Sequence, residues 1–320
     1  MTREEHACSA PVISVRDLRK SYRGVERVHG ISFEVERGQI FGFLGVNGAG
    51  KTTSIEILEG YRRRDGGEVE VLGTDPAHGR RAWRDRIGLV LQDSTLNPVY
   101  TVRETVSMFA RYFSAPTSIE RTLAATGLVA QGDERIGRLS GGQRRRVDVA
   151  LGLVGDPEIL FLDEPTTGLD PAARREMWAM IESLRDAGKT VFLTTHYMDE
   201  AQHLADHLVI LRAGAIVAQG SPDRLRRSLG VASEISFGLP HGVSAGQLER
   251  VLERPVVVVG DVASLRSDAV QRDLTALLSW ARRHEIELRH LQVREPTLDD
   301  VFVQLAEPDD AGVATGAPRA

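Results

Sequence analysis

The feature that most constrains this chain is a glycine-rich segment that follows an apolar run and precedes a helix-forming one. Residues 45–52 are Gly-Val-Asn-Gly-Ala-Gly-Lys-Thr, which fits the pattern G-x-x-x-x-G-K-[ST]. The preceding run Gln39–Leu44 predicts a strand, and Lys51–Glu59 predicts a helix. Glycines let backbone amides approach phosphate oxygens, and a helix N-terminus favours negative charge. The order of strand, loop and helix therefore predicts a binding site for the phosphates of a nucleotide.

Two side chains of this loop have distinct expected roles. We expect Lys51 to reach the β- and γ-phosphates of ATP, and the hydroxyl of Thr52 to bind Mg²⁺. Lysine suits this position because a compact ammonium fits where a planar guanidinium would be too bulky. The other residues that we expect to contact the nucleotide here are Asn47, Gly48, Ala49, Gly50 and Thr53.

An acidic pair forms the second part of the expected site. Ile159–Leu162 is a short apolar run bounded by Pro157 and Asp163, as expected of a buried parallel strand. Asp163 would end this strand and bind Mg²⁺ through water, and Glu164 would polarise the attacking water. An acidic pair alone indicates little, but downstream of a phosphate loop it predicts nucleotide hydrolysis.

The segment Leu139-Ser140-Gly141-Gly142-Gln143 predicts another anion-binding helix N-terminus. Its glycines and the Ser140 hydroxyl would offer amides and a hydroxyl to a phosphate group. One nucleotide does not need two such helix ends from a single chain. Two copies facing head to tail would use both, so that each copy closes over the ATP bound by the other.

With these motifs in place, the chain resembles an ABC-type nucleotide-binding subunit over about Val12–Gly220. The family signature Leu-Ser-Gly-Gly-Gln is present at 139–143 without departure. The phosphate loop departs once, with Val46 where the family often has proline, at a position that varies within the motif. The resemblance implies an α/β fold of the P-loop NTPase (ABC ATPase) type with an inserted helical subdomain. It also implies ATP and Mg²⁺ as cofactors, and a second copy of the chain as partner in an ATP-sandwich dimer.

The resemblance implies roles for four further residues. Tyr22 is similar to the aromatic residue that stacks on adenine, although a packing tyrosine in a hairpin turn is the alternative. Gln92 resembles the glutamine that senses Mg²⁺ and the attacking water and links to the membrane partner; an ordinary loop glutamine is the alternative. Asp170 resembles the loop that crosses the dimer interface. His196, at the end of a predicted strand, resembles the switch histidine at the γ-phosphate.

Strands alternate with helices along most of the chain, which predicts an α/β sheet. We expect a mainly helical insertion at Thr101–Gly137. The other expected strands here are Val12–Leu18, Gly30–Val35, Val191–Thr195 and Leu208–Leu211. The expected divisions are a flexible N-terminus at 1–11, a nucleotide-binding domain at 12–228 with a helical and signature subdomain at about 93–150, a small C-terminal α/β accessory domain at 229–306 and a disordered tail at 307–320.

Three strands and two helices are predicted in the accessory domain. The expected strands are Ile235–Phe237, Val256–Val259 and Ile286–Val293, and the expected helices are Ala245–Leu252 and Ala269–His284. Regulation, support of a dimer and docking to a permease are all compatible with this pattern.

Composition narrows the setting in which the chain works. No segment reaches the about 20 consecutive apolar residues that span a bilayer, and Met1–Pro11 lacks the apolar core of a secretory signal. A net charge of -5 argues against a general nucleic-acid binder. We interpret the arginine runs Arg62–Arg64 and Arg144–Arg146 as solvated faces. The single cysteine, Cys8, excludes an internal disulfide and suits a reducing cytosol.

A pair of histidines forms a competing pattern. His203 and His207 stand four residues apart on a predicted helix and could share a face that binds Zn²⁺. No glutamate lies between them in the metalloprotease arrangement, and no third ligand is obvious. Asp199 and Asp206 suit a solvated face, so we do not expect a zinc site.

The C-terminal segment Glu295–Phe302 bears on what the ATPase drives. It resembles the ending of ATPases from the daunorubicin-resistance type of ABC exporter, and Gln92-Asp93 and Thr101–Glu104 are similar to that group. A terminal helix with Thr297 as its N-cap would explain the segment equally well.

This resemblance implies an exporter ATPase for a hydrophobic small molecule, drug-like or lipid-like. The partner would be a separate ABC-2 type membrane permease, and the chain would lie at the cytoplasmic face of the cell membrane. One alternative is a soluble ABC protein acting on ribosomes or DNA, which would carry two fused ATPase halves or long coiled-coil insertions. The other is an importer ATPase.

Overall fold

The structure is a computed structural model that describes residues 10–46, 48–92, 95–228, 232–295, 297, 298 and 300. The chain divides into two compact units, Met1–Pro222 and Asp223–Ala320. The predictions for residues 1–9, which include Cys8, for Asn47 and for the tail at 307–320 lie outside the described residues.

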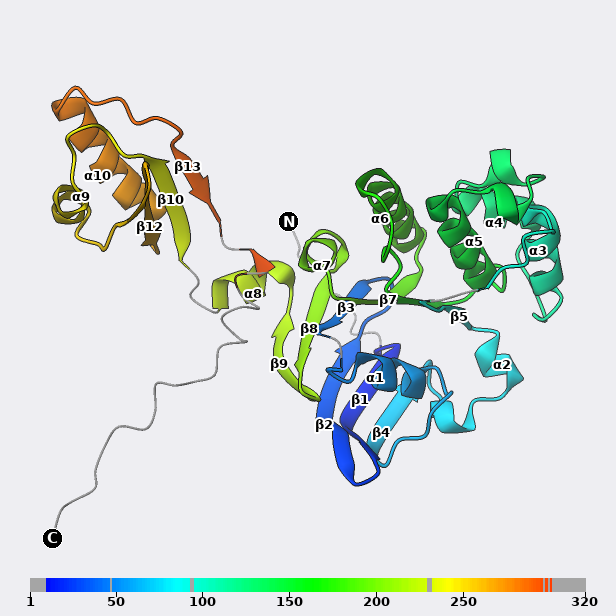
Figure 1. Ribbon diagram of the computed structural model, residues 1–320. Helices are drawn as coiled ribbons and strands as arrows, with labels where there is room; N and C mark the ends of the chain where they lie inside the picture. The colour runs from blue at the N-terminus through cyan, green and yellow to red at the C-terminus, as the bar shows by residue number, and fades with distance from the viewer. Residues whose placement is uncertain are drawn as a thin grey trace, which may run out of the picture. The chain divides into compact units, whose positions relative to one another are not determined.

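The first unit is built around a six-stranded sheet with the order β5-β6-β7-β3-β8-β9 (Figure 1). β5, β6, β7, β3 and β8 run parallel, and β9 pairs antiparallel with β8. The strands are β3 (Ile40–Gly45), β5 (Ile87–Val90), β6 (Ile159–Asp163), β7 (Thr190–Thr195), β8 (His207–Arg212) and β9 (Ala215–Gly220). The strands predicted at 39–44, 159–162, 191–195 and 208–211 are confirmed. The sequence pattern does not predict β5 and β9.

Alternate residues of these strands enter two cores, one on each face of the sheet. Phe161 of β6 packs in the core that includes α1, whereas Leu160 and Leu162 pack in the core that includes α5, α6 and α7. The helices are α1 (Lys51–Leu58), α5 (Gly141–Leu153), α6 (Pro171–Asp186) and α7 (Met198–Leu204). Burial on both faces explains why the central strands are nearly continuous apolar runs.

A three-stranded antiparallel sheet, with the order β2-β1-β4, shares the first of these cores. Its strands are β1 (Ile13–Tyr22), β2 (Val25–Val35) and β4 (Gly66–Val71). Tyr22 pairs with Val25 across a hairpin turn, where Gly24 has a φ of 81° that permits the tight connection. The two strands predicted here are confirmed and run longer than predicted.

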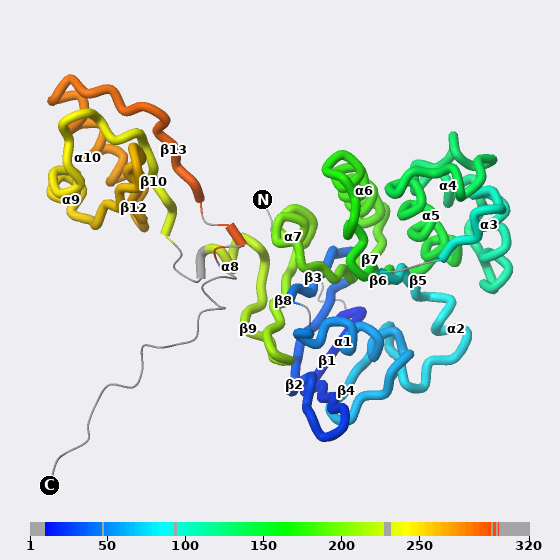
Figure 2. The backbone as a smooth tube through the Cα atoms, viewed as in Figure 1, coloured from blue at the N-terminus to red at the C-terminus, as the bar shows by residue number. Residues whose placement is uncertain are grey.

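The segment between β5 and β6 is mainly helical, as predicted. It holds α3 (Val102–Ala110), α4 (Ile119–Ala125) and α5, while the short α2 (Arg81–Arg84) precedes β5. Thr101 and Glu104 form a capping box at the start of α3. Buried side chains of α3, α4 and α5 form their own core, so these helices gather beside the sheet (Figure 2).

The second unit pairs a four-stranded antiparallel sheet, β11-β12-β10-β13, with helices α9 and α10. Its elements are β10 (Ser233–Gly238), α9 (Ala245–Leu252), β11 (Val257–Val259), β12 (Val262–Ser267), α10 (Val270–Arg283) and β13 (Gln292–Arg294), and α8 (Pro222–Ser228) precedes them. The strand predicted at Ile286–Val293 is wrong over most of its length. Glu285 and His290 have φ angles of 57° and 53°, which interrupt extended pairing. Ile286 packs instead against the core of this unit.

The zinc alternative depends on a helix that the structure does not contain. α7 ends at Leu204 and His207 begins β8, so the prediction that His203 and His207 share a helix is wrong. His203 packs on Trp178, with ring centroids 4.7 Å apart. In the part of the chain that the structure describes, no group of three or more His, Cys, Asp or Glu could hold a metal ion. None of the described helices has the length and apolar content to cross a bilayer.

Candidate functional site

The phosphate loop connects β3 to α1, as predicted. Gly48 and Gly50 have φ angles of 82° and 101°, a conformation that residues with a Cβ atom rarely adopt. A Cβ atom on Gly50 would also lie 2.9 Å from the carbonyl oxygen of Arg27. Glycine is therefore required here, and the loop delivers the N-terminus of α1, whose first amides have no partners within the helix.

Lys51 is buried in the loop, with 6% of its surface exposed. Its Nζ donates a hydrogen bond of 2.6 Å to the carbonyl oxygen of Gly45 and lies 3.9 Å from Oε1 of Glu164. Burial lowers the pKa of the Lys51 ammonium, while the carboxylates of Glu164 and Asp163 oppose that shift. A cation held in this way gains from an anionic ligand, as a phosphate group would be.

The acidic pair lies at the C-terminal end of β6. Thr194 of the neighbouring strand β7 donates from its hydroxyl to Asp163. The backbone N–H of Glu164 bonds to Thr194, at 3.1 Å from both its carbonyl and its hydroxyl oxygen. Glu164 has a φ of 46°, an unfavourable conformation for a non-glycine residue. Hydrogen bonds from the backbone N–H of Glu164 to Thr194 therefore hold Glu164 in this strained backbone conformation.

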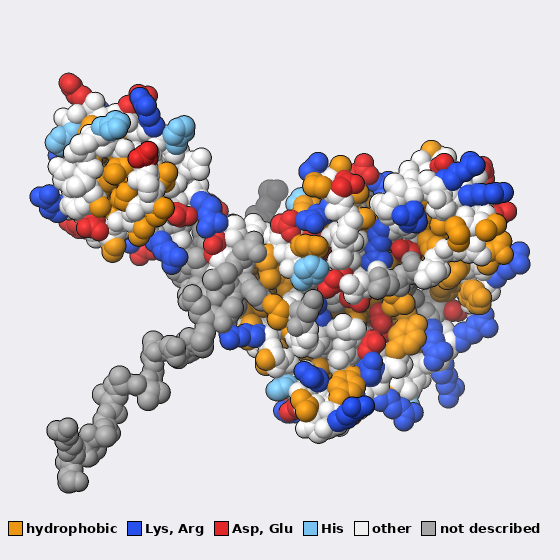
Figure 3. Space-filling model, in the orientation of Figure 1, with side chains coloured by type: hydrophobic (Ala, Val, Ile, Leu, Met, Phe, Trp, Pro, Cys, Tyr) orange, Lys and Arg blue, Asp and Glu red, His pale blue; other side chains and the backbone are white. Residues whose placement is uncertain are grey.

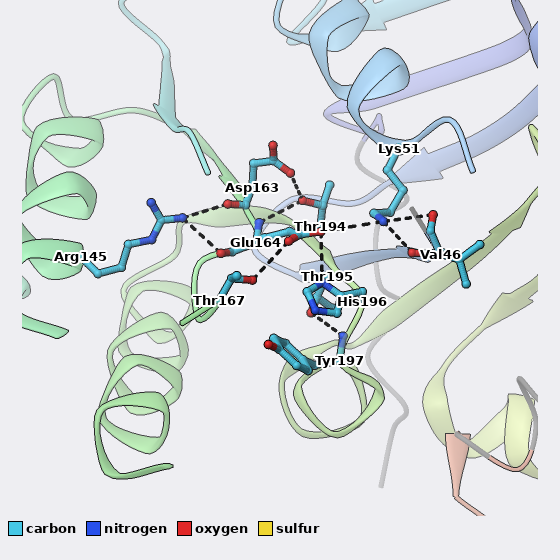
Figure 4. A network of polar contacts seen from close by, with 11 residues as sticks. Val46, Lys51, Arg145, Asp163, Glu164, Thr167, Thr194, Thr195, His196 and Tyr197 are labelled. Atoms are coloured by element: carbon cyan, nitrogen blue, oxygen red, sulfur yellow. Dashed lines mark hydrogen bonds and ion pairs between the residues drawn. The ribbon is translucent and has the colours of Figure 1, made fainter. Parts of the chain in front are cut away.

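The carboxylate of Glu164 contacts several polar side chains of the site. Nδ1 of His196 lies 3.1 Å from its Oε1, and the Thr167 hydroxyl donates to its Oε2 at 3.2 Å. Figure 4 shows Lys51, from α1, and His196, from the end of β7, both directed toward the carboxylate of Glu164. A carboxylate fixed by three neighbours is suited to orienting a water molecule.

A cavity of about 710 Å³ opens beside this carboxylate. The predicted site residues that line it are Tyr22, Gly48, Gly50, Lys51, Thr52, Thr53, Gln92, Glu164 and His196, and the sequence analysis did not predict Arg27 and Thr167, which also line it. Ala49, a residue of the loop, is buried, and neither it nor Asp163 lines the cavity. The cavity thus unites residues from distant parts of the chain that were selected separately from the sequence.

Tyr22 stands at the edge of this cavity beside two cations. Its hydroxyl lies 3.5 Å from that of Thr53. The guanidinium of Arg62 lies 5.3 Å from the centre of its ring, and Nζ of Lys20 lies 5.6 Å away. The ring is half-buried, and a planar base entering here would meet both the aromatic ring and these cations.

The Leu-Ser-Gly-Gly-Gln segment lies outside the cavity. Ser140 is the N-cap of α5, and its side chain and that of Gln143 form a capping box. Gly141 and Gly142 form the first turn of α5. None of these residues lines the cavity. Within one chain, this helix end is separate from the phosphate loop.

Asp170 also lies outside the cavity, at the N-cap of α6. Its carboxylate accepts hydrogen bonds from the backbone N–H groups of Ala173, at 3.0 Å, and Ala172, at 2.9 Å. These bonds lower the pKa of Asp170. A capping role is therefore visible within the single chain.

The sequence pattern does not reveal the role of Arg145, because the run Arg144–Arg146 is typical of a solvated face. That interpretation is wrong for Arg145, which is 8% exposed. Its guanidinium donates to five backbone carbonyls, those of Leu91, Gln92, Asp163, Glu164 and Pro165, at 2.6 to 3.3 Å. It therefore ties α5 to both Gln92 and the acidic pair. The signal was its spacing, since the buried residue Val149 follows four residues later on the same helix face.

Comparison with known proteins agrees with this geometry. Residues 28–167 match the ABC transporter family, and residues 233–297 match the C-terminal domain of ABC transporter domain-containing proteins. The Nod factor export ATP-binding protein I of Ralstonia nicotianae is 40% identical over 93% of this chain and 94% of its own length. The daunorubicin resistance ATP-binding protein DrrA3 of Streptomyces coeruleorubidus is 36% identical over 93% of this chain and 96% of its own length.

Solved structures show the same fold. The cbiO1 protein of Clostridium perfringens, part of the ABC transporter complex cbiONQ, is 28% identical and aligns with a TM-score of 0.64 over 69% of this chain and 92% of its own. The ATP-binding subunit of another ABC transporter is 25% identical and aligns with a TM-score of 0.61 over 68% of this chain and 93% of its own. Given the loop, the acidic pair and these relatives, the chain belongs to the ABC transporter family, as one of its ATP-binding and ATP-hydrolysing subunits.

Proposed function

We propose that this chain powers an ABC-2 type exporter, through a separate membrane permease, for a hydrophobic drug-like or lipid-like molecule. The relatives support export, since they are an export ATP-binding protein and a daunorubicin resistance ATP-binding protein that this chain matches over 93% of its length. In this proposal residues 12–228 bind the nucleotide, residues 229–306 form an accessory domain, and the chain lies at the cytoplasmic face of the membrane.

The proposed catalytic roles follow from the contacts of Glu164. Glu164 orients and polarises the water that attacks the γ-phosphate, while His196, at 3.1 Å, holds the carboxylate and contacts that phosphate. Lys51 neutralises charge on the β- and γ-phosphates. Tyr22 stacks on the adenine ring, and Gln92 senses whether the site is filled.

The residues proposed for Mg²⁺ offer oxygen ligands, which this ion prefers. They are the hydroxyl of Thr52, the amide of Gln92 and the carboxylate of Asp163. Thr52 and Gln92 both line the cavity and are exposed. Asp163 lies at the end of β6, next to Glu164, and is partly exposed. The ion would neutralise charge on the phosphate groups while these side chains hold it in place.

A second copy of the chain completes the proposed site. The α5 N-terminus, at Ser140–Gln143, offers amides at its positive end but contributes nothing to the cavity of its own chain. In a head-to-tail pair it would face the nucleotide on the other copy, and Asp170 would lie at the interface. ATP would favour the closed pair, and hydrolysis would let the pair reopen.

A groove of about 450 Å³ most supports a membrane partner. It is lined by the C-terminal end of α1, by β5 and by the aromatic residues Tyr61, Phe109 and Tyr112. These aromatics are 71%, 38% and 73% exposed. Exposed aromatic clusters are typical of protein interfaces. Figure 3 shows hydrophobic side chains beside basic ones in the region of α2 and α3.

Two elements connect this groove to the nucleotide cavity. β5 lines the groove and leads directly to Gln92, which lines the cavity. α1 begins at Lys51, which lines the cavity, and its C-cap residue Glu59 lines the groove. Both elements could therefore transmit a structural change at the nucleotide to a permease helix bound in the groove.

Co-purification tests the proposal. The tagged chain is expressed in its native host, membranes are solubilised gently, and the eluted proteins are identified, with an unrelated tagged ATPase as control. We expect a stoichiometric polytopic membrane protein to elute with this chain alone. Elution with ribosomes or DNA, or with no membrane protein, would contradict the exporter proposal and leave the ATPase assignment intact.

A further inference from the structure

Glu59 is a buried acid that the proposed ATPase chemistry does not use. It is the C-cap residue of α1, 7% exposed, and it lines the aromatic groove. Within the described residues, its carboxylate has no hydrogen bond or ion pair. Water in the groove can still reach this carboxylate, but a partner that covered it without offering a hydrogen bond or charge would leave it buried at a cost.

The position of Glu59 on α1 adds to this cost. The C-terminal end of a helix carries partial negative charge, and the last turn of α1 has no basic residue to offset it. Burial, with the negative charges of Asp163 and Glu56, raises the pKa of Glu59 to about 8. The isolated chain therefore holds a carboxyl group that would ionise more easily beside a cation.

The rest of the groove does not supply that cation. Arg84 of α2 also lines the groove, but no ion pair joins it to Glu59 among the described residues. Arg81 donates to the backbone carbonyl of Tyr112 at the groove, at 3.2 Å. The walls are otherwise formed by aromatic and aliphatic side chains such as Phe113 and Leu151.

We propose that Glu59 selects the occupant of this groove, a short amphipathic helix of the permease that presents one arginine or lysine to its carboxylate. The inference rests on the proposed function, since it names the chemistry of the partner at the proposed docking groove. Tyr61, Phe109 and Tyr112 suit such an occupant, because aromatic faces attract cations and pack apolar surface. Arg84 would repel a second cation, so the occupant carries a single one.

An apolar occupant fits this groove less well. It would remove the remaining water from Glu59 and leave the carboxyl group without a partner, which costs free energy. A paired cation instead removes that cost and adds a charge-assisted hydrogen bond. Because one misplaced charge disfavours binding, Glu59 also discriminates against permease helices that lack the cation.

The test compares two isosteric variants on the same helix. Glu59→Gln removes the carboxylate from the groove, whereas Glu56→Gln removes one that does not line it. Each full-length variant is tagged, and its permease is recovered from native membranes and quantified against wild type, with ATP binding as a check on folding. We expect permease recovery to fall about tenfold for Glu59→Gln, the effect of about 1.4 kcal/mol, and to stay at the wild-type level for Glu56→Gln.

A charge reversal completes the test. Replacing the basic residue of the permease docking helix by glutamate should abolish recovery with wild-type chain, and Glu59→Lys should restore it. If wild type recovers the permease and Glu59→Gln recovers as much, the inference about Glu59 fails while the exporter proposal holds. If wild type recovers no membrane protein, the exporter proposal itself fails.

Discussion

The two ends of α1 carry charges of the sign that a helix end disfavours. Lys51 places a cation at the N-terminus and Glu59 places an acid at the C-terminus, and both are buried. Burial lowers the pKa of Lys51 and raises that of Glu59 to about 8, so each side chain is pushed toward its neutral form. At the first end the proposed explanation is the phosphate of a nucleotide. By the same reasoning, the second end should meet a cation.

The phosphate site at Lys51 has a sequence motif, whereas the proposed partner site at Glu59 has none. Lys51 belongs to a glycine loop whose spacing is fixed by backbone geometry, because Gly48 and Gly50 require positive φ angles. Glu59 is recognised only from its burial and its lack of a partner in the folded chain. The proposed partner site at Glu59 is therefore found from the structure rather than from sequence spacing.

The largest effect that we predict concerns the cavity end. Glu164→Gln should lower ATP turnover about 10²–10⁴-fold while ATP binding is kept, because the amide cannot accept a proton from water. The variant should also accumulate as an ATP-dependent dimer in sedimentation, with Ser140 of one copy facing the nucleotide of the other. Turnover at the wild-type rate would contradict the role of Glu164.

Arg145 sharpens the comparison, because it is a buried charge that already has its partners. Arg145→Met should destabilise the first unit by about 2–4 kcal/mol and reduce turnover, since five backbone carbonyls lose a donor. Urea unfolding measures this change. Arg146→Ala, which breaks an ion pair with Glu176, whose side chain is 64% exposed, is the control and should cost less than about 1 kcal/mol. Equal effects of the two variants would contradict the role assigned to Arg145.

The raised pKa of Glu59 makes the stability of the chain depend on pH. The pKa of Glu59 is raised from 4.5 to about 8 by folding, so the folded chain holds this proton more tightly than the unfolded chain. Its contribution to stability is complete below about pH 4.5 and is lost as the pH rises through about 8. Glu59→Gln should therefore match wild type at pH 4.5 and be more stable, on the order of 1–3 kcal/mol, at pH 8. Thermal unfolding at both pH values measures this difference, and a constant gap would contradict it.

The smallest effect concerns the groove rim. Tyr61→Ala should change stability by less than about 0.5 kcal/mol, because its side chain is 71% exposed. It should still weaken permease recovery, since exposed aromatics contribute strongly at interfaces. Unchanged recovery would indicate that the partner does not contact this side of the groove.

Much of the sheet and the cavity could be predicted because their residues follow local rules. The apolar run before Asp163 predicts a strand buried on both faces, and the strand end places Asp163 and Glu164. Arg145 and Glu59 could not be placed in this way, because spacing indicates a buried face but not which carbonyls or charges will meet it. In the second unit, the apolar residues of Ile286–Val293 predict a strand, but Glu285 and His290 are left-handed, and Ile286, Leu288 and Leu291 pack against the core instead.

Measuring ATP affinity and permease recovery together on Lys51→Met and Glu59→Gln tests the central claim that the two ends of α1 bind different partners. We predict that Lys51→Met loses ATP binding and keeps permease recovery within about twofold, whereas Glu59→Gln keeps ATP binding and loses recovery about tenfold. Loss of both properties in both variants, or full permease recovery with Glu59→Gln, would contradict the claim.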